Sequence, residues 1–191
     1  MTQISIIGTG TMAQAIAGIA GRGGNDVQLI GHAETDKPIT APIVVLAVPY
    51  PAVADVIATR GAELAGKVVV DITNPLNFQT FDSLTVPADS SAAAEIAAAL
   101  PESSVLKAFN TTFGATLAAG TVGPQPTTVL IAGDDADAKA LLADVVKGGG
   151  LDAIDAGSLS RARELEAVGF LQITLAAGEK VRWDGGFAVV A

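Results

Sequence analysis

A glycine-rich turn near the N-terminus constrains the fold of this chain more than any other feature. A β-branched strand pattern ends at Gly8, and a helical pattern of apolar residues begins at Thr11. The segment 8–13, GTGTMA, therefore matches the motif G-x-G-x-x-G/A in the strand–turn–helix context of a dinucleotide-binding unit. A chain that opens in this way is expected to continue as a parallel α/β sheet.

Each position of the motif has a physical role in binding a pyrophosphate. Gly8 permits the tight turn, Gly10 lets the backbone approach the phosphates, and Ala13 lets the helix pack closely on the strand. The helix N-terminus adds free N–H groups and a partial positive charge. A turn that merely reverses the chain is the alternative. We predict that the following residues bind a cofactor: Gly8, Thr9, Gly10, Thr11 and Met12.

Short apolar runs alternate with Ala-rich helical segments along the rest of the chain. The predicted strands are 4–7, 27–30, 43–48, 68–72, 105–109, 128–132 and 152–155. The predicted helices are 11–22, a helix that follows the turn bracketed by Pro49 and Pro51 and runs to about Arg60, 92–100 (capped by Ser90 or Ser91), a helix capped by Asp134 that stops at 148–150, and 158–177. This alternation predicts the α/β class with a doubly wound parallel sheet, a Rossmann-like fold in one domain, 1–191.

Composition excludes several classes of protein. With 50% hydrophobic and 16% charged residues, the 191-residue chain is not disordered. The net charge of −9 disfavours a nucleic-acid partner, and the absence of cysteine removes disulfides and thiolate metal sites. The longest purely apolar run, 43–48, is far shorter than the ~20 residues of a membrane helix, and the first residues lack the basic region of a signal peptide. We expect a cytoplasmic protein with no metal site.

The residues after the second predicted strand distinguish NADP from NAD. An NAD site usually has an acid at this tip to hold the ribose 2′-OH, but here Gly31 and His32 follow the strand. Thr9, His32 and Lys37 could all donate to a 2′-phosphate, so NADP is favoured.

Two observations weigh against that assignment. Glu34 and Asp36 follow closely in the sequence and would favour NAD, and His32 has an exposed loop position as its alternative.

The segment 33–42 is unusually short. A complete dinucleotide domain would insert a helix, a strand and a helix there. We therefore expect a truncated segment after the second strand, a missing edge strand and a more open adenine site.

Several segments together resemble the coenzyme F-420-dependent NADP reductase family, over almost the whole chain. They are GTGTMAQAIA (8–17), VVLAVPYPAV (44–53), VVVDITNPL (68–76), VLKAFNTT (105–112), AGDDADAK (132–139) and DAGSLSRARELE (155–166). The first of them is also similar to pyrroline-5-carboxylate reductase. That family continues into a large helical domain, for which this chain leaves too few residues.

The resemblance implies an enzyme that passes hydride between NADP(H) and a flavin or a deazaflavin such as coenzyme F-420. It also implies further cofactor contacts at three strand ends. Ala47, Val48 and Pro49 would line the nicotinamide ribose, Asn74 and Pro75 would hold the carboxamide, and Phe109 and Asn110 would flank the ring. The chain departs from the family at Gly31 and His32, where members often carry Ser-Arg, and it has no distinctive deazaflavin motif.

The residue types fit transfer between two ring cofactors, which needs alignment rather than an acid. Reduction of a carbonyl would call for a positioned proton donor. Lys107 and Asp71 are the candidates for that role, and the alternative for both is a paired or solvated strand end. An imine or ketone reductase and a non-catalytic NADPH-binding sensor therefore remain as other functions.

The C-terminal region contributes two further expectations. On the last predicted helix, Arg161 with Glu164 and Arg163 with Glu166 are spaced i,i+3, which indicates a solvated, mutually paired face. Phe170, Trp183 and Phe187 are more consistent with core or dimer contacts than with a cofactor platform, and the apolar segment 187–190 could form part of a homodimer contact.

Overall fold

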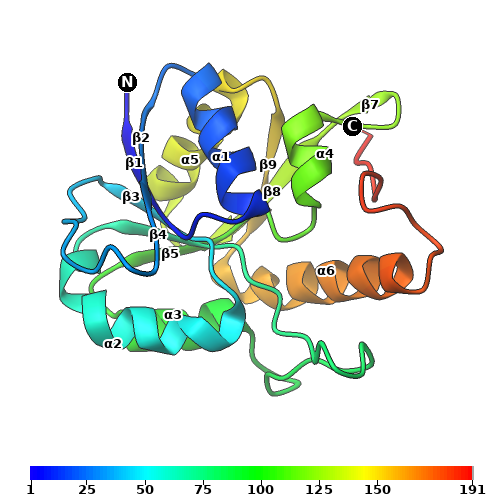
Figure 1. Cartoon of the computed structure of the whole chain (residues 1–191), viewed down its shortest axis with the longest axis horizontal. Coiled ribbons are helices and arrows are strands. Elements are labelled where there is room, and N and C mark those ends of the chain that lie inside the picture. Colours follow the sequence, from blue (N-terminus) through cyan, green and yellow to red (C-terminus); the bar gives the residue numbers. More distant parts are fainter. Residues whose placement is uncertain (191) are drawn as a thin grey trace.

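The computed structural model, which describes residues 1–190, is built on a seven-stranded sheet with the order β2-β1-β3-β4-β5-β8-β9 (Figure 1). The strands are β1 (Gln3–Ile7), β2 (Asp26–Ile30), β3 (Ile43–Leu46), β4 (Val68–Asp71), β5 (Ser104–Lys107), β8 (Thr128–Gly133) and β9 (Asp152–Gly157). The predicted α/β class is confirmed, because helices alternate with strands and cover both faces of this sheet.

The sheet is mostly, but not wholly, parallel. β5 and β8 pair antiparallel, whereas the other neighbouring strands pair parallel. The prediction of an all-parallel sheet is therefore wrong at this pair. Between the two strands lie a short helix, α4 (Gly114–Ala119), and a hairpin of β6 (Thr121–Val122) and β7 (Gln125–Pro126), which the sequence patterns did not reveal. No crossover helix carries the chain from the end of β5 back to the end of the sheet where β5 began. β8 therefore starts near the end of β5 and runs in the opposite direction.

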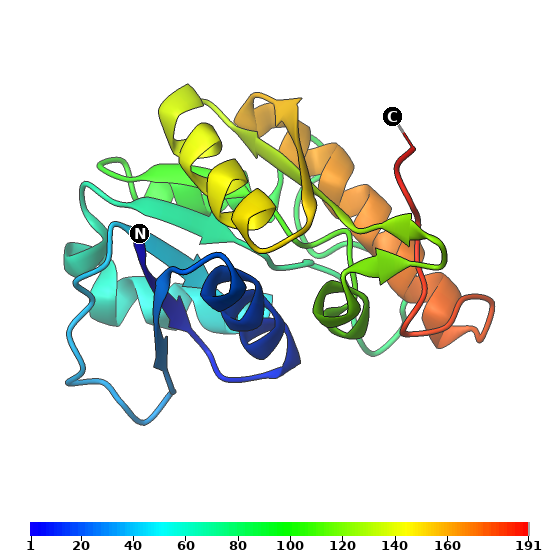
Figure 2. The same ribbon diagram turned by 90° about the horizontal axis from the view of Figure 1, so that it is seen from above.

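Two helical layers cover the sheet. α1 (Thr11–Arg22) and α5 (Ala136–Gly148) lie side by side on one face, as Figure 2 shows from above. α2 (Val53–Leu64), α3 (Ala92–Ala99) and α6 (Ala162–Ala177) cover the other face (Figure 1). In β3, Ile43 and Val45 pack under the first layer, and Val44 and Leu46 pack under the second. Burial on both faces explains the continuous β-branched run of this strand.

Hydrogen bonds at the helix ends correct one predicted cap. Ser91 caps α3, because its Oγ accepts from the N–H of Ala94 at 3.0 Å. Asp135, not Asp134, caps α5 by accepting from the N–H of Ala138 at 3.0 Å. Asp134 accepts instead from the N–H of Leu159, at the start of the 3-10 turn (Leu159–Arg161) that precedes α6.

The segment between β2 and β3 contains no helix or strand, as its short length predicted. β2 is consequently an edge strand of the sheet. Ile39 is buried in the same cluster as Val44 and Leu46 of β3, and its N–H donates to Glu63 of α2 at 2.9 Å. Arg60 of α2 donates to the carbonyl of Lys37 and to Glu63. These contacts anchor the loop to α2. No helix within residues 1–190 has the length and apolar character needed to cross a membrane.

Candidate functional site

The glycine-rich turn lies where the strand order reverses, between β1 and β3. Open α/β sheets bind ligands at such a switch point, outside the carboxyl ends of the strands. Gly8 has a φ of +121°, and a Cβ atom there would lie 2.2 Å from the carbonyl oxygen of Ala47. Its N–H donates to Ile30 at 2.8 Å. Only glycine allows the ends of β1, β2 and β3 to approach in this way.

Gly10 and the start of α1 leave room for an anion. Gly10 has ordinary backbone angles, and a Cβ atom built there would meet nothing within 4 Å. No side chain caps α1, and its first turn contains no acidic residue. The first N–H groups of a helix have no intrahelical partners, so an open N-terminus suits a phosphate group. The turn therefore fits the pyrophosphate of a dinucleotide.

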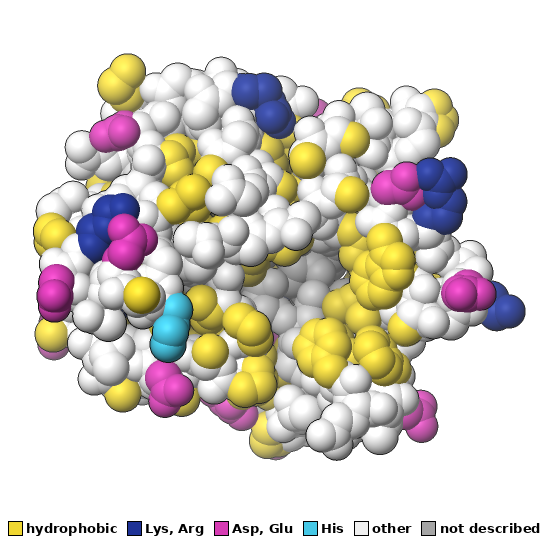
Figure 3. Space-filling view, viewed as in Figure 1, with side chains coloured by type: hydrophobic (Ala, Val, Ile, Leu, Met, Phe, Trp, Pro, Cys, Tyr) yellow, Lys and Arg dark blue, Asp and Glu magenta, His cyan; other side chains and the backbone are white. Residues whose placement is uncertain are grey.

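Two hollows meet at the N-terminus of α1. The first, of 600 Å³, lies between α1 and α4. The second, of 360 Å³, extends toward the ends of β4 and β5 and toward α6. The hollow face in Figure 3 is bordered by hydrophobic side chains. The second hollow is lined by Thr11, Met12, Ile72, Asn74, Phe78, Asn110, Thr112, Phe113, Gly114, Ala115, Ile173 and Trp183.

Asn74 and Asn110 are held together at the edge of the second hollow. The side-chain N–H₂ of Asn74 donates to the backbone carbonyl of Asn110, and that of Asn110 donates to Asn74 Oδ1, both at 2.9 Å. Asn110 also donates to the carbonyl of Leu165 on α6 at 2.9 Å. Its Oδ1 is buried without a hydrogen-bond partner among residues 1–190. The two predicted asparagines thus form one rigid, polar wall.

Other predicted residues do not reach these hollows. Phe109 is 1% exposed and packs in the core with a φ of +64°, so the expectation that its ring flanks a cofactor ring is corrected. Pro75 is buried, and its carbonyl accepts from Thr85. Ala47 lies against Gly8, and Val48 packs on the core beneath α2. Pro49 is exposed before the 3-10 turn of Tyr50–Ala52.

The end of β2, where the sequence predicted no acidic residue, is occupied by a carboxylate. Glu34 folds back, so its carboxylate accepts from the N–H of Gly31 at 2.7 Å, and an acid does lie at the tip. Lys37 is not free, because its Nζ lies 3.3 Å from Glu34 and donates to the carbonyl of Leu29 at 2.7 Å. His32 is exposed. The position of Glu34 in the sequence did not indicate that the loop folds back and brings its carboxylate to Gly31.

Lys107 and Asp71, the candidate proton donors, are buried together. Both are 0% exposed and lie 2.8 Å apart. Glu166 of α6 joins them, with its carboxylate 2.9 Å from Lys107 Nζ. The expectation that Glu166 pairs with Arg163 on a solvated face is therefore wrong, whereas Arg161 does pair with Glu164 at 3.1 Å. Burial raises the pKa of Glu166, although the charge of Lys107 opposes the shift. None of the three lines the hollows.

Sequence reasoning missed the residues that close the second hollow. Trp183 is 53% exposed and lines the hollow, so the core half of the expected core or dimer contact is wrong for this residue, and the dimer contact stays a prediction. Its ring centroid lies 4.9 Å from that of Phe113. The segment after α6 returns toward α4, where Thr116 donates to the carbonyl of Gly185 at 2.8 Å (Figure 1). The only sequence signal was a lone tryptophan in an aromatic-poor chain.

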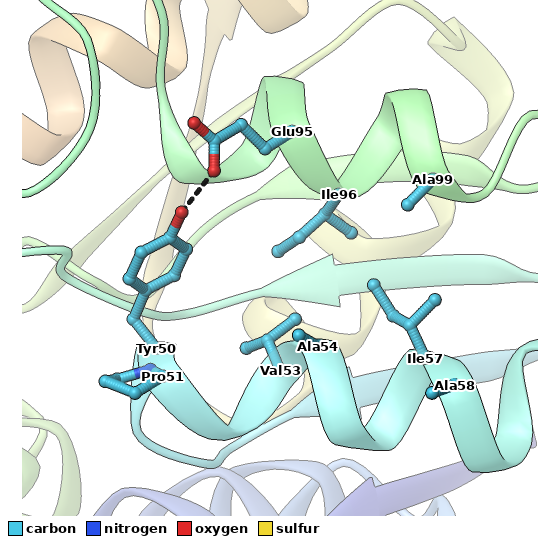
Figure 4. A pocket seen from close by; sticks show the side chains of 9 residues that line it. All are labelled: Tyr50, Pro51, Val53, Ala54, Ile57, Ala58, Glu95, Ile96 and Ala99. Atoms are coloured by element: carbon cyan, nitrogen blue, oxygen red, sulfur yellow. Dashed lines mark hydrogen bonds between the residues drawn. The ribbon is translucent and has the colours of Figure 1, made fainter.

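A separate apolar groove of 460 Å³ lies between α2 and α3 (Figure 4). Tyr50 points across it and donates a hydrogen bond to Glu95. Burial and the Glu95 carboxylate raise the pKa of Tyr50, so its hydroxyl stays protonated. Val53, Ile57 and other small apolar side chains form the rest of the lining. The groove contains none of the predicted cofactor residues.

Comparison with known proteins places this geometry in a family. No family model matches the chain. The F420-dependent NADP reductase of Methanocaldococcus jannaschii is 33% identical over 156 residues, which cover 80% of this chain and 70% of that protein. The chain belongs to the F420-dependent NADP reductase family. The resemblance carried by its sequence segments is therefore confirmed.

Solved structures agree with this family assignment. A candidate F420-dependent NADP reductase of Arthrobacter sp. FB24 has a TM-score of 0.85 and 26% identity, and each chain covers 100% of the other. An imine reductase of Streptomyces aurantiacus has a TM-score of 0.63 and 16% identity, and the match covers 93% of this chain and 63% of that one. The second likeness shows the fold alone.

Proposed function

We propose that this member of the F420-dependent NADP reductase family transfers hydride between NADP(H) and a deazaflavin or flavin acceptor. The proposal rests on one observation, which is that a phosphate-binding turn and a hollow for flat rings adjoin each other. An open, uncapped helix N-terminus beside Gly10 leads directly into a hollow walled by amides and aromatic rings. The first feature suits a pyrophosphate, and the second suits the flat rings of two cofactors.

The chain's own residues bind and orient in this proposal. The N–H groups at the start of α1 hold the pyrophosphate, and Asn74 and Asn110 hold the polar end of the nicotinamide. Phe78, Phe113 and Trp183 supply an apolar border that excludes water from the hollow, which Met12 also lines. The bound cofactors themselves supply the redox chemistry. Alignment is the protein's contribution, which explains why no exposed acid is required.

The alternative of an imine or ketone reductase loses its proposed proton donors in this geometry. Lys107 and Asp71 are 0% exposed and lie outside the lining of the hollows. A non-catalytic NADPH-binding sensor would bind the same nucleotide, so only the oxidation of NADPH by an acceptor distinguishes it from the proposed enzyme. A homodimer through the exposed segment containing Phe187 and Val190, a cytoplasmic location and a single domain over 1–191 stay predictions.

An anaerobic titration followed by turnover tests the proposed function. NADPH fluorescence would be titrated with the protein, and a deazaflavin or FMN would then be added to the same cuvette. We expect saturable binding and then loss of the reduced nicotinamide absorbance. A Gly10→Val variant is the control. A Cβ atom there has no protein atom within 4 Å, so we expect the variant to fold normally, and its branched side chain would occupy the place of the pyrophosphate. Binding without oxidation of NADPH by any acceptor, or tight binding by Gly10→Val, would contradict the proposal.

A further inference from the structure

Glu34 occupies the tip of β2 as a bound anion would. Its two carboxylate oxygens take different donors: Oε2 accepts from the N–H of Gly31 at 2.7 Å, and Oε1 lies 3.3 Å from Lys37 Nζ. These contacts lower the pKa of Glu34, so it is ionised at neutral pH. The side chains of Glu34 and Lys37 are 48% and 37% exposed, which leaves both free to turn into solvent.

The carboxylate also lies beside the glycine-rich turn. A Cβ atom at Gly31 would be 3.3 Å from Glu34 Oε2 and 3.7 Å from Thr9 Cγ2. Thr9, Gly31 and Glu34 therefore border one small space between the ends of β1 and β2. When a pyrophosphate binds at the first βα turn, the adenosine ribose and its 2′ substituent lie at the tip of the second strand.

We propose that Glu34 determines the choice of dinucleotide by standing in the place of the 2′-phosphate. This inference rests on the proposed function, because it concerns the adenosine end of the same dinucleotide site. In its observed position the carboxylate can accept a hydrogen bond from the ribose 2′-OH of NADH. The same carboxylate repels the 2′-phosphate of NADPH, so it must leave before NADPH binds.

The departure of Glu34 would expose donors suited to phosphate. The N–H of Gly31 and the Nζ of Lys37 both lose an acceptor when the carboxylate turns away, and the side chain of Thr9 borders the same space. The site therefore accepts either nucleotide, and NADPH binds less tightly than these donors alone would allow. We expect wild-type dissociation constants for NADPH and NADH to differ by about tenfold or less.

A pair of charge-matched variants tests the inference. Glu34→Gln removes the carboxylate at the tip, whereas Asp36→Asn removes an equal charge on the same loop from a residue that has no ion pair or side-chain hydrogen bond among residues 1–190. Dissociation constants for NADPH and NADH would be measured by nicotinamide fluorescence. Glu34→Gln should tighten NADPH by about tenfold and leave NADH unchanged or weaker, while Asp36→Asn should change the ratio by less than about threefold.

Competition with 2′-AMP and 5′-AMP locates the effect. Glu34→Gln should strengthen competition by 2′-AMP and leave competition by 5′-AMP unchanged or weaker. Equal shifts in the two variants would attribute the effect to net charge, and an unchanged ratio in Glu34→Gln would show that the carboxylate does not contact the site. Either result overturns the inference while NADPH binding itself persists. A wild-type chain that binds neither nucleotide would overturn the proposed function as well.

Discussion

The ammonium of Lys107 on β5 lies 2.9 Å from the carboxylate of Glu166 on α6, and both side chains are shielded from solvent. Lys107 also lies 2.8 Å from Asp71 and donates to the carbonyl of Thr73. Glu166 in turn accepts from the N–H of Ala92, at the start of α3, at 2.9 Å. One lysine thus ties two strands and two helices together directly beneath the loop that carries Asn74.

Removing the shared cation should destabilise the fold strongly. Lys107→Met leaves two carboxylates buried without their positive partner, which we expect to lower the free energy of unfolding by about 3–5 kcal/mol. Urea denaturation followed by circular dichroism would measure the loss. Arg161→Met is the control, because its pair with Glu164 is exposed and should contribute about 1 kcal/mol or less. Similar losses in both variants would show that burial does not set the strength of the Lys107 contacts.

The raised pKa of Glu166 predicts a pH dependence with a definite sign. Burial, opposed by Lys107, places the folded pKa above the ordinary value of 4.5, so the protonated form is favoured in the folded state. The stability contributed by this group is complete below the unfolded pKa and is lost as pH rises through the folded pKa.

The Glu166→Gln variant should lack this loss. As the pH rises above the ordinary carboxyl pKa of 4.5, the free energy of unfolding of the wild type should fall relative to that of Glu166→Gln. Urea titrations at a series of pH values would measure the difference. Glu164→Gln, on the exposed face of the same helix, should show no such trend. A wild type that gains stability over Glu166→Gln with rising pH would reverse the assigned sign.

Gly169 allows α6 to approach the asparagine wall. A Cβ atom at this residue would lie 2.3 Å from Asn74 Oδ1 and 2.9 Å from the carbonyl of Asn110. Gly169→Ala should therefore push α6 away and cost about 1–3 kcal/mol of stability, despite the better helix propensity of alanine. Gly61→Ala, in α2, is the matched control: its Cβ would have no neighbour closer than 3.7 Å, so stability should rise by up to about 1 kcal/mol. Thermal unfolding of both variants decides whether the contact is as tight as the structure indicates.

Local sequence patterns predicted the main strands and helices of the sheet but not the reversal of chain direction between β5 and β8. The turn around Gly8 and the continuous apolar run of β3 were readable because strand geometry and two-sided burial leave periodic signals. The reversal before β8 was not, since α4 and the β6–β7 hairpin are too short to show a period. Asn74 and Asn110 could be predicted because residues at neighbouring carboxyl ends must lie close together.

Contacts between distant segments account for most errors at the site. Nothing near Glu166 in the sequence indicates that it faces Lys107, because that contact depends on how α6 packs across the sheet. Glu34 was judged by its distance along the loop, whereas its hydrogen bond to Gly31 depends on how the loop turns. Phe109 follows a predicted strand, but its backbone conformation directs the ring into the core.

Trp183 offers a direct test of where the nicotinamide binds. It is the only tryptophan in the chain, and it borders the hollow that also contains Asn74 and Asn110. Reduced nicotinamide absorbs light at the wavelengths that tryptophan emits, so NADPH bound there should quench the emission of Trp183. The Gly10→Val variant should show no quenching at the same NADPH concentration. Trp183→Ala removes an apolar wall and should raise the acceptor's KM by about tenfold, whereas Trp183→Phe keeps the ring and should change it little. Saturable NADPH binding with unchanged Trp183 emission would place the nicotinamide outside this hollow.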